Sequence, residues 1–165
     1  MPLYPPATSG SSLHTASVRI TDDDLSGLPA AASWAVVLTI ASTPLQASIK
    51  AAAGDRIRVA GNFMRKGSHF LDWVLLDNLG AISLYASTQT SSAGTEGSPT
   101  LYPSLSFDYA TAAEMFTVAA GHINAGNITI GLAHQGAGTG NSNVVYAHTT
   151  YPFRLRLENI GPEPS

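Results

Sequence analysis

The sequence predicts an all-β fold in which two antiparallel sheets pack face to face. Three observations favour this class: apolar and polar residues alternate with a period of two, turn residues recur about every ten residues, and helical periodicity is nearly absent. The chain has 165 residues and no cysteine, so neither disulfides nor thiolate metal sites can stabilise it. A chain of this length buries roughly two thirds of its unfolded surface, and we therefore expect one domain held together by packing.

The predicted strands begin near Ala16 and end at recurring turn residues, such as Gly54-Asp55 and Asn78-Leu79-Gly80. Residues two apart in a strand point to the same face, so alternating apolar residues mark the buried side of each strand. About nine short strands are expected on this basis. The groups that share a face are Val18 and Ile20; Trp34, Val36, Leu38 and Ile40; Leu45, Ala47 and Ile49; Ile57, Val59 and Phe63; Ile128, Ile130 and Leu132; and Phe153, Leu155 and Leu157.

Two further segments are predicted as strands for other reasons. Residues 70–76, F-L-D-W-V-L-L, are apolar on both faces, which is typical of a central strand or of one covered by a neighbouring subunit. Residues 111–120 begin with Thr111 and Glu114 at the spacing of a helix capping box, but the following M-F-T-V favours a strand. The all-β context decides for a strand there.

Two segments lack periodicity. Residues 1–16 are rich in Pro, Ser and Thr and are expected to form an extended arm. The two-sheet sandwich, for which a jelly roll is the favoured topology, then spans residues 17–165. Residues 88–107 are expected to form a long loop, and loops of that length in compact domains are usually functional or packed on a partner. This loop is the first place to look for recognition.

The charge pattern excludes several partners. Charged residues make up 12% of the chain, and eight basic residues stand against eleven acidic ones, for a net charge of −3. Because the basic residues are scattered along the sequence, a surface that follows phosphates is not expected, and neither is nucleic acid. Residues 1–12 lack the regions of a secretion signal and residues 28–41 are too short to span a bilayer, so no membrane partner is expected. The basic residues are Arg19, Lys50, Arg56, Arg58, Arg65, Lys66, Arg154 and Arg156.

The sequence does not predict a metal site. The five histidines, His14, His69, His122, His134 and His148, are not spaced as metal ligands, and we expect them at the surface or the rim of the sheets. His134 and His148, on neighbouring predicted strands, are the pair expected to meet if any does. The Asp22-Asp23-Asp24 run is compatible with calcium, but a solvated acidic turn is favoured because no further acidic ligand follows at loop spacing.

No catalytic residue and no cofactor are assigned, and the chain is not expected to be an enzyme. Carboxylates of the type that glycosidases use are present, among them Asp72, but Asp72 lies in the apolar run beside Trp73 and favours an interface or a buried hydrogen bond. The aromatic residues Tyr102, Phe107 and Tyr109, with Tyr85 nearby, would either stack on a sugar ring or pin the loop onto the protein.

Four segments resemble one class of proteins: S-W-A-V-V-L-T-I, L-Q-A-S-I-K-A-A-A-G-D-R-I-R-V, H-F-L-D-W-V-L-L and Y-P-F-R-L-R-L-E-N-I-G-P. They resemble small jelly-roll virion proteins of tailed phages, especially those infecting actinobacteria, which are similar in outline to trimeric tumour-necrosis-factor-like and complement globular-head folds. The resemblance covers roughly residues 16–162 and depends on strand pattern and turn residues. It implies a jelly-roll sandwich, a homotrimer with Phe70, Trp73 and Leu75 in the trimer interface, and a role in the virion.

Within that class, a capsid decoration subunit on the capsid surface, made in the host cytoplasm, is favoured. Its arm residues Leu3, Tyr4, Pro5 and Pro6 would dock on the major capsid protein. The alternative is a tail, fibre or receptor-binding module that recognises host-surface carbohydrate through Tyr102, Phe107 and Tyr109.

Overall fold

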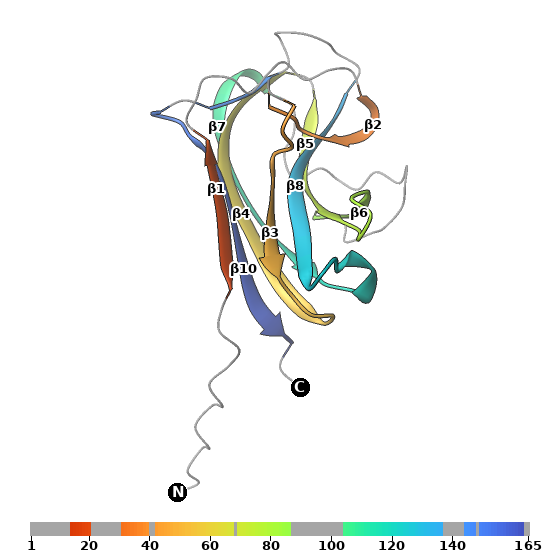
Figure 1. Ribbon diagram of the computed structural model, residues 1–165. Coiled ribbons are helices and arrows are strands. Elements are labelled where there is room, and N and C mark those ends of the chain that lie inside the picture. Colours follow the sequence, from red (N-terminus) through yellow and green to blue (C-terminus); the bar gives the residue numbers. More distant parts are fainter. Residues whose placement is uncertain are drawn as a thin grey trace, which may run out of the picture.

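Two antiparallel sheets form a sandwich in the computed structural model, as the alternation predicts (Figure 1). Sheet A contains β1 (Thr15–Ile20), β10 (Phe153–Pro162), β4 (Asp55–Gly67) and β7 (Ser104–Thr117), with β9 (Val144–Tyr146) beside β4. Sheet B contains β2 (Ala31–Val36), β3 (Gln46–Lys50), β8 (Asn127–Gly136), β5 (Phe70–Leu76) and β6 (Ile82–Tyr85). The structure describes residues 14–20, 31–39, 42–67, 69–86, 104–136, 144–147 and 149–163; side chains are excluded at 31, 32, 104–113, 144 and 146.

The strand order is that of a jelly roll. β2 and β3 pair with successive parts of β8, residues 133–136 and 127–131, and together occupy the place of one strand. Strands equally distant from the two ends of the described chain then pair with each other: β1 with β10, β2 and β3 with β8, β4 with β7, and β5 with β6. A long hairpin folded over on itself produces this order, with the short β9 as an addition.

The core lies between the two sheets and is filled by the inward side of each strand. On β4 the burial alternates as the sequence predicts, with Ile57, Val59 and Phe63 fully buried. Trp73 of β5 crosses the sandwich and meets Phe63 edge to face, with 5.8 Å between ring centroids and 85° between ring planes. Gly61 of β4 lies opposite Trp73, and its missing side chain leaves the space that the indole occupies.

A second apolar cluster explains why β5 is apolar on both faces. Trp73 and Leu75 point into the core, whereas Val74 and Leu76 point to the other side of sheet B and pack with Tyr85. Half-buried side chains complete this cluster, and the rings of Trp34 and Tyr85 are 5.7 Å apart. The partly buried members are Trp34, Val36 and Ile82.

The structure corrects two of the expected element boundaries. β7 begins at Ser104, so residues 104–107 belong to a strand and not to the predicted loop, while the strand predicted from Thr111 is present and ends at Thr117. β2 ends at Val36; Val37 follows opposite the core residue Leu132 and is fully buried, whereas Trp34 and Val36 point to the second cluster and Leu38 is 46% exposed. Trp34, Val36 and Leu38 therefore do not share one buried face. After β7, a 3₁₀ turn (Ala120–His122) leads into β8.

Candidate functional site

Several of the candidate residues lie outside the described part of the chain. Among the predicted recognition residues these are Leu3, Tyr4, Pro5 and Pro6 of the arm and Tyr102, and among the residues considered as metal ligands they are His148, Asp22, Asp23 and Asp24. Phe107 and Tyr109 are placed in β7, with Tyr109 opposite Met64 of β4, but their side chains are not described. Tyr85 is buried against Trp34. The expected loop group therefore remains a prediction.

The predicted trimer interface needs correction. Trp73 and Leu75 are 1% and 0% exposed in the single chain, where they fill the core between the sheets. Their side chains are not available to a neighbouring subunit. Phe70, at the start of β5, is 37% exposed, and it alone of the three can contact another molecule.

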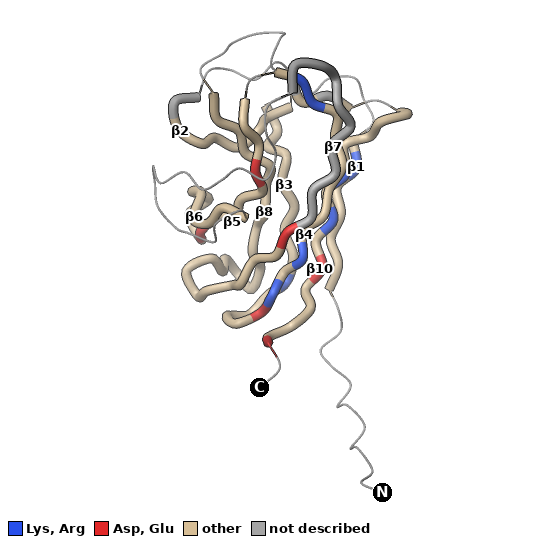
Figure 2. Tube along the Cα trace, turned by 180° about the vertical axis from the view of Figure 1, so that it is seen from behind, with Lys and Arg blue, Asp and Glu red and all other residues tan. Residues whose placement is uncertain are grey.

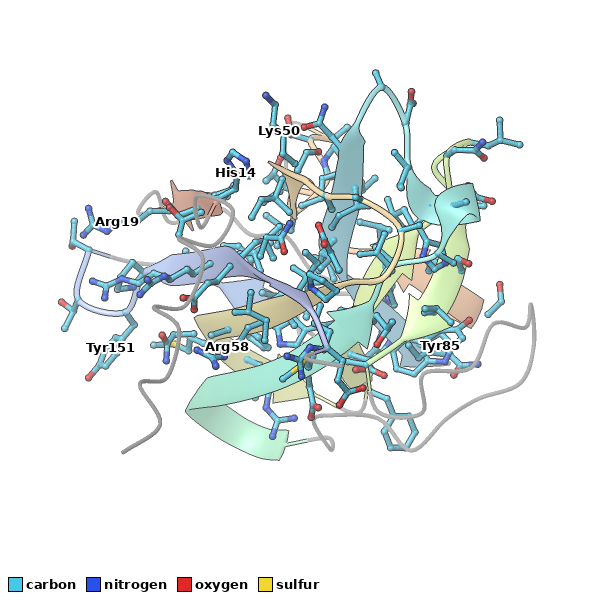
Figure 3. The ribbon with its side chains drawn as sticks, turned by 90° about the horizontal axis from the view of Figure 1, so that it is seen from below. His14, Arg19, Lys50, Arg58, Tyr85 and Tyr151 are labelled. Carbon is cyan, nitrogen blue, oxygen red and sulfur yellow. The ribbon has the colours of Figure 1, made fainter. Side chains whose placement is uncertain are left out.

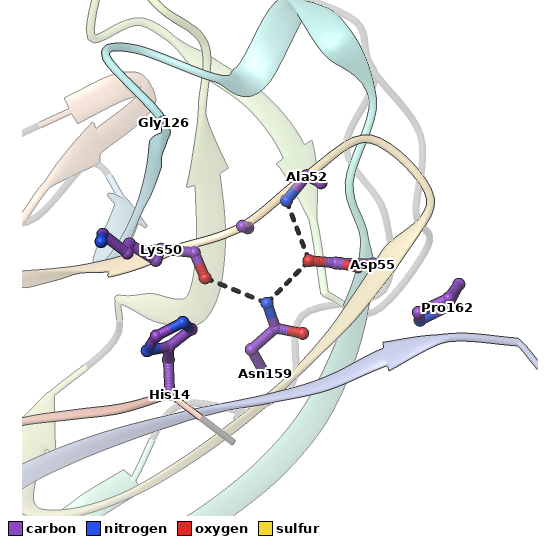
Figure 4. A pocket seen from close by; sticks show the side chains of 8 residues that line it. His14, Lys50, Ala52, Asp55, Gly126, Asn159 and Pro162 are labelled. Carbon is purple, nitrogen blue, oxygen red and sulfur yellow. Dashed lines mark hydrogen bonds between the residues drawn. The ribbon is translucent and has the colours of Figure 1, made fainter. Parts of the chain in front are cut away.

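One hollow of about 390 Å³ lies where β1, the β3–β4 turn and β10 meet (Figure 4). Asn159 of β10 organises it: its Nδ2 donates to the carbonyl oxygen of Lys50 at 3.0 Å and to Oδ2 of Asp55 at 2.7 Å. Its Oδ1 accepts a hydrogen bond from the N–H of Gly161 at 2.9 Å. These bonds hold the β3–β4 turn against β10, so the role of Asn159 is structural.

Asn159→Ala is expected to destabilise the domain by about 2 kcal/mol, because it removes three hydrogen bonds, one of them from the buried N–H of Gly161. Chemical unfolding of the two proteins measures this loss. Asn124→Ala is the matched control, since Asn124 is exposed and its Nδ2 makes one long bond, 3.3 Å, to the carbonyl oxygen of Asn78. Equal stabilities of the two variants would contradict the assigned task of Asn159.

A second hollow of about 210 Å³ lies between the β5–β6 turn and the start of β8, and its lining is rich in amide side chains. Asp77 Oδ1 accepts hydrogen bonds from the N–H groups of Leu79 and Ala81, both at 2.9 Å. His122 Nδ1 accepts from the N–H of Ala119, so its Nε2 carries the proton and faces Ser83 Oγ at 3.2 Å. Burial lowers the pKa of His122, and nearby Asp77 partly opposes this. The amides of this lining are Gln46, Asn78, Asn124 and Asn127.

Three histidines are buried, contrary to the expectation that they lie at the surface or the rim. His69, His122 and His134 are 3%, 7% and 2% exposed. His69 and His134 are stacked, with 3.0 Å between their Nδ1 atoms, so one neutral ring donates a hydrogen bond to the other. Burial, and then the neighbouring His69, lower the pKa of His134 to about 4. His134 is therefore uncharged at neutral pH.

The apolar alternation of the two strands indicated that His69 and His134 are buried, although the spacing of the histidines along the chain did not. His69 is in phase with Leu71 and Trp73, and His134 is in phase with Ile130 and Leu132, so both point into the sandwich. Asp72, in the opposite phase, lies across from Ala133 on the other side of sheet B and is 1% exposed, so it is buried as expected.

The outer face of sheet A collects basic residues that are far apart in the sequence. Arg56 and Arg58 on β4, Arg154 and Arg156 on β10, and Arg19 on β1 alternate with the inward apolar residues of their strands. Figure 2 shows basic positions concentrated on these three strands, and Figure 3 shows Arg19 and Arg58 on the sheet A side, away from Tyr85. We call this surface, with Glu158, the arginine face. The scattered appearance of these residues in the sequence was misleading.

The described residues were also considered for a metal site and for a membrane-spanning helix. No three His, Asp or Glu side chains there are grouped so as to hold a metal ion. No helix in that part of the chain is long and apolar enough to cross a membrane.

Comparisons with known proteins found no matching family model and no matching curated protein. Two solved structures are similar at a low level: the infectious bursal disease virus VP2 subviral particle, with a TM-score of 0.30 and 13% identity, and infectious bursal disease virus Gx strain, with a TM-score of 0.30 and 15% identity. The matches cover 98% of this chain and 46% and 47% of those chains, so this chain spans about half their length. At this TM-score the likeness carries no argument about function.

Proposed function

We propose that this chain is a non-enzymatic structural subunit of a phage virion, a capsid decoration protein that forms homotrimers. The observation that carries the proposal is the jelly-roll strand order, which viral capsid domains and lectins share. This is an argument from fold, and the resemblance of four segments to jelly-roll virion proteins supports the same class.

The outer faces of the two sheets differ in chemistry, so each is suited to a different partner. Sheet A presents arginines outward, whereas sheet B carries the second apolar cluster, beside which Phe70 is exposed. We place the contact between subunits on the sheet B side, at Phe70, because apolar surface is what association buries most favourably. We propose that the arm residues bind the major capsid protein, and that the three arms of a trimer strengthen this binding by acting together. These residues are Leu3, Tyr4, Pro5 and Pro6.

Labelling of virions tests this role. Antibodies against the purified chain, applied to particles of the virus that encodes it, should label the head in electron micrographs. Removing residues 1–13 leaves β1 whole, so a shortened protein can be tested for rebinding to heads that lack the subunit. We expect its binding to fall well below that of the full chain. Labelling confined to the tail would contradict decoration of the capsid.

The alternative, a tail or fibre module that binds host-surface carbohydrate, is favoured by one observation. The second hollow is open and lined by amides, the side chains that commonly hydrogen-bond sugar hydroxyls. Binding of the chain to surface glycans, lost in an Asn124→Ala and Gln46→Ala double variant that still folds, would support this alternative.

A further inference from the structure

The arginine face has an ordered arrangement that follows from strand pairing. Arg19 of β1 lies directly opposite Arg154 of β10, and Ser17 lies opposite Arg156. In the next row Glu158 lies between Thr15 of β1 and Arg58 of β4. Side chains that are opposite each other in a ladder have Cβ atoms about 5 Å apart, so Arg19 and Arg154 are cross-strand neighbours of like charge.

The balance of charge on this face is strongly positive. The face carries five arginines and, among the described side chains, one carboxylate, Glu158, which accepts a hydrogen bond from Arg58 Nη1 at 3.2 Å. Directly opposed like charges are destabilising in a sheet, and the whole chain is acidic, with a net charge of −3. The isolated protein therefore has unfavourable repulsion on this face that nearby carboxylates of another molecule would remove.

The arrangement fits a protein surface better than a nucleic acid. Glu158 lies within the cationic patch, where it would repel a phosphate backbone. Ala60 lies opposite Arg156 and the exposed Met115 lies opposite Arg58, so apolar area adjoins the charged side chains. A guanidinium group binds a carboxylate through two parallel hydrogen bonds, and small apolar patches between such pairs are typical of protein interfaces.

We infer that the arginine face docks onto an acidic protein surface, through Arg19, Arg154 and Arg156 above all. The inference rests on the proposed function, and it names the chemistry of the surface that the subunit would meet on the shell. It also assigns different tasks to the two sides of the sandwich: sheet B contacts other copies of the chain, and sheet A contacts the shell.

A direct binding assay tests the inference at neutral pH with the full chain. The probes are a fluorescein-labelled oligo-glutamate peptide and a labelled DNA duplex of the same net charge, each titrated at low and at physiological ionic strength. We expect the peptide to bind, more weakly at higher salt, and the Arg19→Ser, Arg154→Ser, Arg156→Ser triple variant to bind about tenfold more weakly. The peptide should bind more tightly than the duplex.

The control carries the same change of charge on the other side of the sandwich: Lys50→Ser, Asn78→Asp and Leu79→Asp, all at exposed positions. It should bind the peptide like the unmodified chain. Equal loss in the control, absence of peptide binding, or tighter arginine-dependent binding of the duplex would each overturn the inference.

Light scattering on the same samples separates the two proposals. The arginine variant should keep the mass of the unmodified protein, and a lower mass would show that the face is a subunit contact, which also overturns the inference. If the peptide binds as expected but the chain is absent from virions, the proposed function fails while the docking surface stands.

Discussion

Gly61→Ala is expected to lower the free energy of unfolding by about 3 kcal/mol, a large share of the stability of a domain of this size. A Cβ atom at position 61 would lie 2.6 Å from the carbonyl oxygen of Arg154 and 2.6 Å from Cη2 of Trp73. Neither neighbour can move freely, because one is backbone of β10 and the other is a ring that is 1% exposed and packed against Phe63.

Urea unfolding of the variant measures this effect, with Gly121→Ala as control. A Cβ atom at Gly121 meets nothing within 4 Å, so the control should cost little. In a Trp73→Phe background the cost of Gly61→Ala should shrink, since the smaller ring withdraws from position 61, although the Arg154 contact remains. A Gly61→Ala protein as stable as the control would mean that the indole does not occupy this space.

Acid is expected to produce the second large effect. The unfolded chain binds a proton at His134 with an ordinary pKa of 6.5, whereas burial and His69 lower the pKa of the folded protein to about 4. The unfolded state therefore takes up protons first as the pH falls. The stability that uncharged His134 contributes should be present above pH 6.5 and should be lost between pH 6.5 and 4, by on the order of 3 kcal/mol.

Unfolding midpoints measured between pH 6.5 and 4 test whether His134 causes this loss, through the slope of the midpoint against pH. His134→Gln, which cannot be protonated there, should flatten the dependence even if it lowers stability at neutral pH. His14→Gln, at an exposed position, should keep the slope of the unmodified protein. A His134→Gln protein with an unchanged slope would show that other groups cause the loss in acid.

The sequence predicted the parts of the fold that depend on local periodicity. Alternation in β4, β8 and β10 identified the buried residues correctly, because the side chains of a strand point to opposite faces in turn. It failed at β2, where Trp34 and Val36 point to the second cluster on the other side of sheet B and Val37 is the residue that enters the core. The apolar run of β5 is that of a central strand, one of its two predicted alternatives. The assignment of Trp73 and Leu75 to a contact between subunits was wrong, because both side chains fill the core. The cluster that covers the other face of β5 is built from β2, β6 and β8, which lie far apart in the sequence.

The candidate sites depended on pairing that a single sequence does not contain. Arg19 and Arg154 are neighbours only because β1 pairs with β10, and the first strand pairing with the last is a property of the whole topology. His69 and His134 are 65 positions apart and meet because β5 pairs with β8. Their phase within each strand indicated burial, but not which residues they would meet.

The central claim is that the chain is a structural subunit that assembles with itself through its body. Light scattering of the full chain and of the chain lacking residues 1–13 tests it most directly. We expect three chain masses for both proteins, because the arm is assigned to the shell and the contact between subunits to the sheet B side. A single chain mass for the full-length protein would contradict self-assembly through the body.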